Sequence, residues 1–250
     1  MGIYLRANPG EYADKCLVAG DPGRITRLSG LLDDVRLVTE NRGLLGYTGH
    51  YRGQPVSLQC SGMGCPSMAM VGQELLDYGV RSIIRIGTCS AFANDVQNGD
   101  LIVVTGSAAA DGTTRSFADR VPYIAVPDFG LTAALANAAR TREAPLHVGP
   151  VVTVDVEPHL SMQATAGWRD HGLLAVEMES AALFYLALRA SAAGRDRVRA
   201  ACVLTVSDGL DGHPDGPQRY MSDEELQAAT DVMHLVALEA LLASADETRS

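Results

Sequence analysis

The segment of residues 82–90, Ser-Ile-Ile-Arg-Ile-Gly-Thr-Cys-Ser, most constrains the fold. Its three isoleucines form a short β-branched run that ends at Gly87, a pattern typical of a strand buried on both faces within an α/β sheet. Arg85 interrupts this run, and burying a guanidinium without a partner is costly. We therefore expect Arg85 either to pair with an internal carboxylate or, with Thr88 just past the strand, to face an anionic ligand at the carboxyl edge of the sheet.

The charge balance limits the kinds of partner. The 250 residues carry a net charge of −10, and no run of Lys or Arg occurs. We expect neither a nucleic acid nor a membrane as partner, since the chain offers no broad basic surface and no apolar run long enough to span a bilayer. An anion would have to be held by a few individually placed arginines.

The cysteines indicate the compartment. The chain has 5 of them, an odd number, without a C-x-x-C pair and mostly inside apolar runs. This favours a reducing environment over a disulfide framework or a zinc site, and the N-terminus lacks the apolar core of a signal peptide. We expect a cytoplasmic protein.

Strand-like and helix-like patterns alternate to the end of the chain, without an internal repeat or a linker-like break, which predicts a single α/β domain over residues 1–250. The expected strands are residues 16–19, 35–40, 46–51, 54–60, 82–87, 101–104, 148–154, 173–176 and 198–206. Helices are expected to begin near residues 24, 64, 131, 180 and 224. Residues 106–128 are expected to be irregular.

Two glycine-rich turns precede expected helices. Gly20-Asp21-Pro22-Gly23-Arg24 follows the first strand, where a glycine and a helix N-terminus suit an anion, although a plain turn with a surface arginine explains it equally well. Gly62-Met63-Gly64-Cys65-Pro66-Ser67 begins like a dinucleotide fingerprint, but Ser67 replaces the third glycine, so we reject an NAD site.

Acidic residues lie at two later strand ends. Glu177 and Glu179 flank an expected strand-to-helix junction, where both could cap the helix or one could bind ligand hydroxyls. Asp208 ends the strand after residue 206 and is a catalytic candidate. Residues 211–217 form a Gly/Pro/Asp loop in which a metal site at His213 is a weaker interpretation than a solvated loop.

Taken in order, these motifs, together with Asn41-Arg42-Gly43, closely resemble the purine nucleoside phosphorylase and uridine phosphorylase family, specifically its hexameric bacterial and archaeal branch. The resemblance runs from about Tyr4 to the final helix. It implies a distorted central mixed β-sheet flanked by helices, a homohexamer built as a trimer of dimers with shared active sites, and reversible phosphorolysis of a purine nucleoside. Inorganic phosphate would be the co-substrate, and no metal or organic cofactor is called for.

The resemblance also implies roles for individual residues. Gly20, Arg24, Arg85 and Thr88 would hold phosphate, Arg42 would reach the partner's site, Asp208 would be the general acid at the base, and Arg219 would assist it. The nucleoside-binding set would be Tyr4, Glu157, Val176, Glu177, Met178, Glu179 and Ser207.

These roles agree with the chemistry of the residue types. Arginine suits the bidentate geometry of phosphate. Cleavage through an oxocarbenium-like state needs anchored hydroxyls, a placed nucleophile and a protonated leaving group, which Glu179, phosphate and Asp208 would supply. A purine is favoured because Asp208 is retained and no Gln-x-Arg pair of the uridine enzymes occurs between Asp155 and Gly172.

Three positions depart from the family pattern. Tyr4 replaces the usual histidine at the 5′-hydroxyl, Glu157 replaces an aromatic residue, and Arg219 is only an approximate counterpart of the assisting arginine. Glu157 either turns outward, toward a residue such as Arg169, or faces the pocket and selects a substrate with an extra donor.

The alternatives are a methylthioadenosine phosphorylase, a uridine phosphorylase, a water-using nucleosidase and a non-catalytic nucleoside-binding protein. The nucleosidase branch does not keep the phosphate arginines, whereas Arg24, Arg42 and Arg85 are all present.

Overall fold

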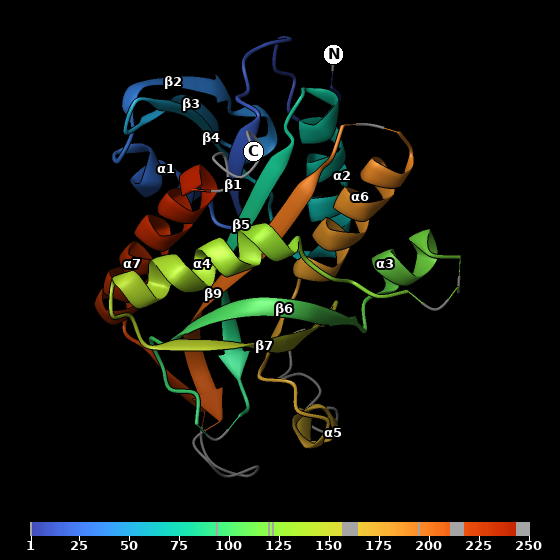
Figure 1. Ribbon diagram of the computed structural model, residues 1–250, viewed down its shortest axis with the longest axis vertical. Helices are drawn as coiled ribbons and strands as arrows, with labels where there is room; N and C mark the ends of the chain where they lie inside the picture. Colours follow the sequence, from blue (N-terminus) through green and yellow to red (C-terminus); the bar gives the residue numbers. More distant parts are fainter. Residues whose placement is uncertain are drawn as a thin grey trace.

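The computed structural model describes residues 2–93, 95–119, 121, 123–156, 165–194, 196–210 and 218–243. Within these residues the strands form one mixed sheet in the order β10-β9-β6-β7-β8-β5-β1-β4-β3-β2 (Figure 1). The strands are β1 (Lys15–Ala19), β2 (Asp33–Thr39), β3 (Gly46–Tyr51), β4 (Gln54–Cys60), β5 (Ser82–Ala91), β6 (Leu101–Ala109), β7 (Leu146–Thr153), β8 (Ala175–Glu177), β9 (Arg199–Leu210) and β10 (Gln218–Tyr220). The helices are α1 (Pro22–Ser29), η1 (Asn41–Gly43), α2 (Gly64–Asp77), α3 (Gly112–Phe117), α4 (Phe129–Thr141), α5 (Thr165–Asp170), α6 (Ser180–Ala192) and α7 (Asp223–Ala243).

Part of the sheet closes on itself. Strand β9 pairs with β6 on one side and, in parallel, with β5 on the other. Because β5 also pairs with β8, β8 with β7 and β7 with β6, the strands β5, β8, β7, β6 and β9 form a ring. The expected distorted mixed sheet is therefore confirmed, with a barrel-like half attached to an open half that ends in the β2–β3–β4 meander.

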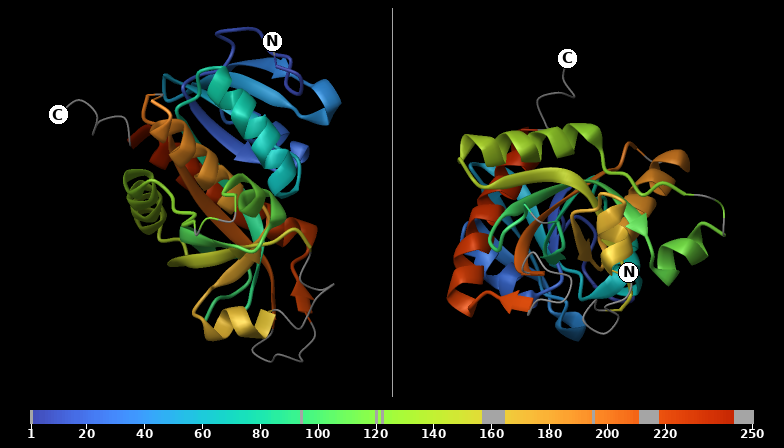
Figure 2. Two further views of the ribbon diagram at one scale, coloured as in Figure 1. Left: turned by 90° about the vertical axis from the view of Figure 1, so that its right-hand side faces the viewer. Right: turned by 90° about the horizontal axis from the view of Figure 1, so that it is seen from below.

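Helices cover both faces of the sheet. Buried side chains of α2 and α6 pack on one face, and these two helices lie side by side, as the left view of Figure 2 shows. Buried side chains of α1, α4 and α7 pack on the other face. The predicted strand at residues 82–87 is β5, whose first six residues are all buried between these layers, as its β-branched pattern requires.

Helix α7 contradicts the expectation that no apolar segment is long enough to span a bilayer. By length and composition it could span a membrane, with a mean hydropathy of 1.3 in its most apolar window. In the fold it packs against α4, β5 and β9, so its apolar character is that of a core helix.

Most predicted elements are confirmed, and the 46–51 and 54–60 hairpin has the predicted bounds. The expectation for residues 106–128 was wrong in part, because β6 continues to Ala109 and α3 follows, capped by Asp111, whose carboxylate accepts a hydrogen bond from the Thr114 amide. Strand β9 continues to Leu210, four residues beyond its predicted end, because β5 and β10 pair with that extension.

The five cysteines are all free and buried, as their apolar surroundings predicted. Burial raises the pKa of each thiol above its ordinary value. Two of them, Cys89 and Cys202, lie on the paired strands β5 and β9.

Candidate active site

A cavity of about 230 Å³ lies at the ends of β1 and β8, beside the later residues of β5 and β9 and near the N-termini of α1, α2 and α6. Its lining contains most of the residues that the sequence singled out. They are Gly20, Arg24, Arg85, Thr88, Val176, Glu177, Met178, Glu179, Ser207 and Asp208.

Arg85 projects from β5 and is 3% exposed. Its Nε lies 3.1 Å from Glu177 Oε2, and its Nη2 lies 2.5 Å from Glu179 Oε2. A Cβ atom on Gly87 would come within 2.6 Å of the Arg85 guanidinium, so the side chain folds back over the bare backbone of Gly87. The expected internal partner of Arg85 is therefore present, and it is a pair of carboxylates that also line the cavity.

Opposing effects act on the proton affinity of Arg85. Burial lowers the pKa of the guanidinium, whereas the charges of Glu179 and Glu177 raise it, and the net pKa is above the ordinary value. Arg85 is thus a permanent cation held by two anions at the cavity wall.

Glu177 sits at the end of β8, and hydrogen-bond donors surround its carboxylate. It accepts from the amides of Glu179 and Ser180, from the hydroxyls of Ser180 and Thr153, and from Arg85. The two amides belong to the start of α6, so this carboxylate caps that helix. The capping interpretation is thus confirmed for Glu177 and wrong for Glu179, whose side chain makes no capping hydrogen bond to α6.

Glu179 has a different environment. One carboxylate oxygen accepts from the Gly64 amide at 2.5 Å, at the first residue of α2, and the other meets Arg85. Burial raises the pKa of Glu179, and the Arg85 charge counteracts this increase. Glu179 thus connects a helix N-terminus, a buried arginine and the cavity.

Arg24 lies in the first turn of α1, after the predicted cap in which Asp21 accepts from the amides of Gly23 and Arg24. It is 8% exposed, its Nη1 donates weakly to the Ile86 carbonyl at 3.4 Å, and its Nε has no hydrogen-bond partner among the described residues. Burial and the neighbouring charge of Arg85 lower the pKa of Arg24 to about 10. Two buried arginines beside one cavity favour an anionic ligand.

A β-bulge in β9 sets the direction of the Asp208 side chain. On β5, Cys89 and Ser90 are consecutive, but their partners on β9 are Val206 and Asp208, so Ser207 is the extra residue. The Ser207 hydroxyl has one proton to donate and lies within hydrogen-bond distance of two acceptors, Asp208 Oδ1 at 2.6 Å and the Cys89 carbonyl at 3.2 Å. Asp208 therefore lies within β9 and not at its end, and the bulge directs it toward the cavity.

Tyr4 and Arg42 do not line this cavity. They meet elsewhere, with the Arg42 guanidinium 5.8 Å from the centre of the Tyr4 ring. Arg42 has a left-handed backbone, with a φ of 58°, and its side chain is exposed. The pair forms a surface edge whose expected role in a partner's site remains a prediction.

Two predicted residues cannot be placed in full. Glu157 lies outside the described residues, and Arg169, its suggested outward partner, has its Nε 3.9 Å from Asp170. The backbone of Arg219 pairs with Gly209, next to the pairing of Tyr220 with Asp208, and its side chain lies outside the described part of the structure.

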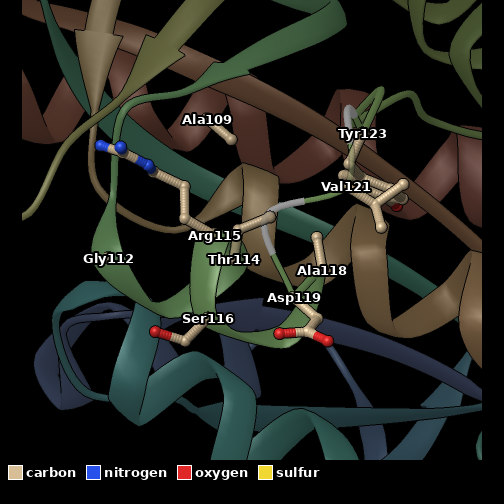
Figure 3. Close-up of a pocket in the computed structure, with 9 residues that line it drawn as sticks. All are labelled: Ala109, Gly112, Thr114, Arg115, Ser116, Ala118, Asp119, Val121 and Tyr123. Carbon is tan, nitrogen blue, oxygen red and sulfur yellow. The ribbon is translucent and has the colours of Figure 1, made fainter.

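A larger cavity of about 790 Å³ lies at α3 (Figure 3). It is lined by Ala109, Gly112, Thr114, Arg115, Ser116, Ala118, Asp119, Val121 and Tyr123, none of which the sequence indicated as functional. Figure 3 shows Arg115 pointing away from Asp119, so charged groups do not converge here as they do around Arg85.

Comparison with known sequences identifies the relatives of this chain. Residues 14–243 match the family model described as Phosphorylase superfamily. The chain belongs to this superfamily. It is 39% identical to the "Purine nucleoside phosphorylase DeoD-type" of Myxococcus xanthus, over 92% of this chain and 96% of that protein. It is 37% identical to the protein of the same name from Jannaschia sp., over 96% and 99%, and 36% identical to the "Guanosine phosphorylase" of Halorubrum lacusprofundi, over 89% of each chain.

Sequence reasoning missed the residues that support the charged ones. Thr153 and Ser180 both donate to Glu177, and Ser180 also contacts Ser107. Glu74, a buried acid on α2, accepts from three backbone amides near the N-terminus. A carboxylate among the apolar positions of α2 was a usable signal, whereas the hydroxyl network depends on strand pairings that no local pattern reveals.

Proposed function

We propose that this protein is a purine nucleoside phosphorylase, which converts a purine ribonucleoside or deoxyribonucleoside and phosphate into free base and pentose 1-phosphate. The observation that carries the proposal is the convergence of Arg24, Arg85, Glu179 and Asp208 on one cavity. The names of the relatives, at 36–39% identity over most of both chains, support the same activity.

Phosphate would bind at the arginine side of the cavity. Arg24 and Arg85 supply charged donors, and Gly20 and Thr88 border the same space. The incompletely paired Arg24 and the mutual repulsion of the two arginines both favour an anion there. Arg42 would add a third cation from the partner subunit.

The nucleoside would bind between Glu179 and Asp208. Glu179 would hold the ribose hydroxyls with Met178 beside them, while Val176, Glu177 and Ser207 border the same cavity. A phosphate oxygen would attack C1′ as the bond from C1′ to N9 breaks, and the electron pair of that bond would pass to the base. Asp208 would deliver a proton to N7 and so neutralise the leaving purine.

The exposed apolar side chains support an assembly of several copies. Phe117, Val121, Ile124, Val126 and Phe129 are 36–87% exposed and lie in one segment around α3 and the start of α4. Apolar residues concentrated in this way mark an interface. A hexamer built from dimers, in which Tyr4 and Arg42 complete a neighbour's site, accounts for this segment and for the distance of that pair from the cavity.

Release of free base from inosine, guanosine, adenosine and 5′-modified adenosines, with and without phosphate, tests the proposal. We expect turnover to require phosphate and to be fastest on a purine nucleoside. Arg85→Ala should raise the apparent KM for phosphate and slow turnover. Equal rates with and without phosphate would exclude a phosphorylase and indicate a hydrolase, and preference for uridine would exclude the purine assignment.

A further inference from the structure

The N-terminal segment of residues 2–5 is held by a single buried carboxylate. Glu74, on α2, is 8% exposed, and it accepts hydrogen bonds from three consecutive amides. Ile3 N and Tyr4 N lie 2.5 and 2.9 Å from Glu74 Oε1, and Leu5 N lies 2.8 Å from Oε2. Consecutive amides directed at one anion form a nest, an arrangement that needs a negative charge at its centre.

The other contacts that order this segment also come from side chains and not from a strand or helix. Residues 2–5 belong to no strand or helix, so sheet or helix hydrogen bonds do not satisfy their amides. The Tyr78 hydroxyl accepts from the Gly2 amide at 2.8 Å, one turn after Glu74 on the same helix end. The end of α2 therefore fixes the path of the segment.

The same segment carries Tyr4 and orders its neighbour Arg42. The Asn41 side-chain amide donates to the Tyr4 carbonyl at 2.5 Å, and the Thr39 hydroxyl donates to the Leu5 carbonyl. The Arg42 guanidinium lies over the Tyr4 ring. Because Arg42 has an unfavourable left-handed backbone, its position depends on such surrounding contacts.

We propose that Glu74 is a positioning residue, which holds the edge formed by Tyr4 and Arg42 in the orientation that completes the site of a second copy of this chain. The proposal rests on the proposed function, in which that edge meets the 5′ end of the nucleoside and the phosphate. Glu74 does not line the cavity at Arg85. Its effect on specificity passes through the backbone of residues 3–5.

The decisive variant is Glu74→Gln, which keeps the shape and removes the charge. A glutamine amide nitrogen would face one of the three amide donors, so we expect hydrogen exchange at Ile3, Tyr4 and Leu5 to rise roughly ten-fold or more. Glu239→Gln is the matched control, because it removes the charge of a partly buried helix carboxylate, on α7, that accepts from Arg52 and Arg142. Exchange at residues 3–5 should be unchanged in the control.

Substrate specificity distinguishes the positioning role from a merely structural one, because a loss of structure alone would lower activity on all nucleosides equally. The ratio of kcat/KM for inosine to that for 5′-deoxyinosine should shift in Glu74→Gln to the ratio of Tyr4→Ala, and the double variant should shift it no further. Equal losses on both nucleosides, with the wild-type ratio retained, would overturn the positioning role, and unchanged exchange at residues 3–5 would overturn the anchor itself. If the wild type shows no phosphate-dependent turnover, the proposed function fails and the positioning role falls with it, while the exchange measurement still decides whether Glu74 anchors the segment.

Discussion

At the scale of single residues, the site consists of charges that fix one another. The sequence predicted that Arg85 would need a partner, because a lone guanidinium inside an isoleucine run is too costly. It could not predict that Glu177 and Glu179 would share this role, since they lie 92 and 94 positions away in the chain and only the β5–β8 pairing brings them close. The sequence also could not distinguish the hydrogen-bonding of the two glutamates. The Glu177 carboxylate accepts from five protein donors, whereas the Glu179 carboxylate has fewer.

Because so many donors bind the Glu177 carboxylate, we can predict in which direction the KM for phosphate changes when its charge is removed. If Glu177 acted only as a nearby negative charge, Glu177→Gln would strengthen phosphate binding. We expect the opposite, a rise of roughly ten-fold or more in the KM for phosphate, because the variant loses the acceptor that orients Arg85. Steady-state kinetics at saturating inosine measures this, with a thermal unfolding scan to verify that the variant is folded. A lower KM for phosphate would contradict the orienting role.

Asp208 allows a chemical test of its proposed proton transfer. Asp208→Asn should reduce kcat on inosine by ~10²–10⁴-fold, the usual contribution of a positioned general acid. On an N7-methylated nucleoside, whose base already carries a positive charge, the loss should be much smaller. Single-turnover rates on the two substrates provide the comparison, and equal losses would indicate that Asp208 serves only the structure of the bulge.

At the scale of elements, local patterns predicted most strands and helices but not how far some strands extend. Turn glycines and alternating residues were sufficient for the hairpin of β3 and β4. The continuations of β6 and β9 have no comparable apolar pattern and exist because neighbouring strands of the ring pair with them. Helix α3 did leave a signal, the capping residue Asp111 ahead of Thr114, which was missed.

Helix α7 introduces a pH dependence through His234. This residue is 1% exposed, and burial with the charges of Arg24 and Arg27 lowers its pKa from 6.5 to about 3. Asp231 on the same helix lies 3.5 Å from its Nδ1. Between these two pKa values the unfolded chain binds a proton that the folded protein does not, so stability should fall as the pH drops below about 6.5, by at most ~1.4 kcal/mol per pH unit.

Urea unfolding at one fixed protomer concentration, between about pH 5 and about pH 7, tests this expectation. His234→Gln should flatten the dependence. His50→Gln, which alters a histidine with a 46% exposed side chain, should leave it unchanged. The same slope in His234→Gln and the wild type would show that other groups cause the acid sensitivity.

At the scale of the whole molecule, the chain carries the cavity at Arg85 and, elsewhere, the Tyr4–Arg42 edge, which in the proposed hexamer completes a neighbour's site. We expect Ile124→Glu, which places a charge in the exposed apolar segment, to dissociate the assembly and to abolish most turnover. Val232→Glu, at an exposed apolar position on α7 and outside this segment, should leave both unchanged. Sedimentation velocity combined with activity assays across the fractions provides the measurement, and a fully active monomer would contradict a shared site.

Because its cysteines are buried, this protein allows the opening of its fold to be followed by the rate of thiol labelling. A thiol-specific reagent needs both access and a thiolate, and each of the five side chains is buried with a raised pKa. Labelling in the native state must therefore wait for the fold to open, and its rate counts opening events. Because Cys89 and Cys202 lie on adjoining strands beside Arg85, the order in which the thiols react would report whether the half of the sheet that carries the candidate site opens before or after the rest.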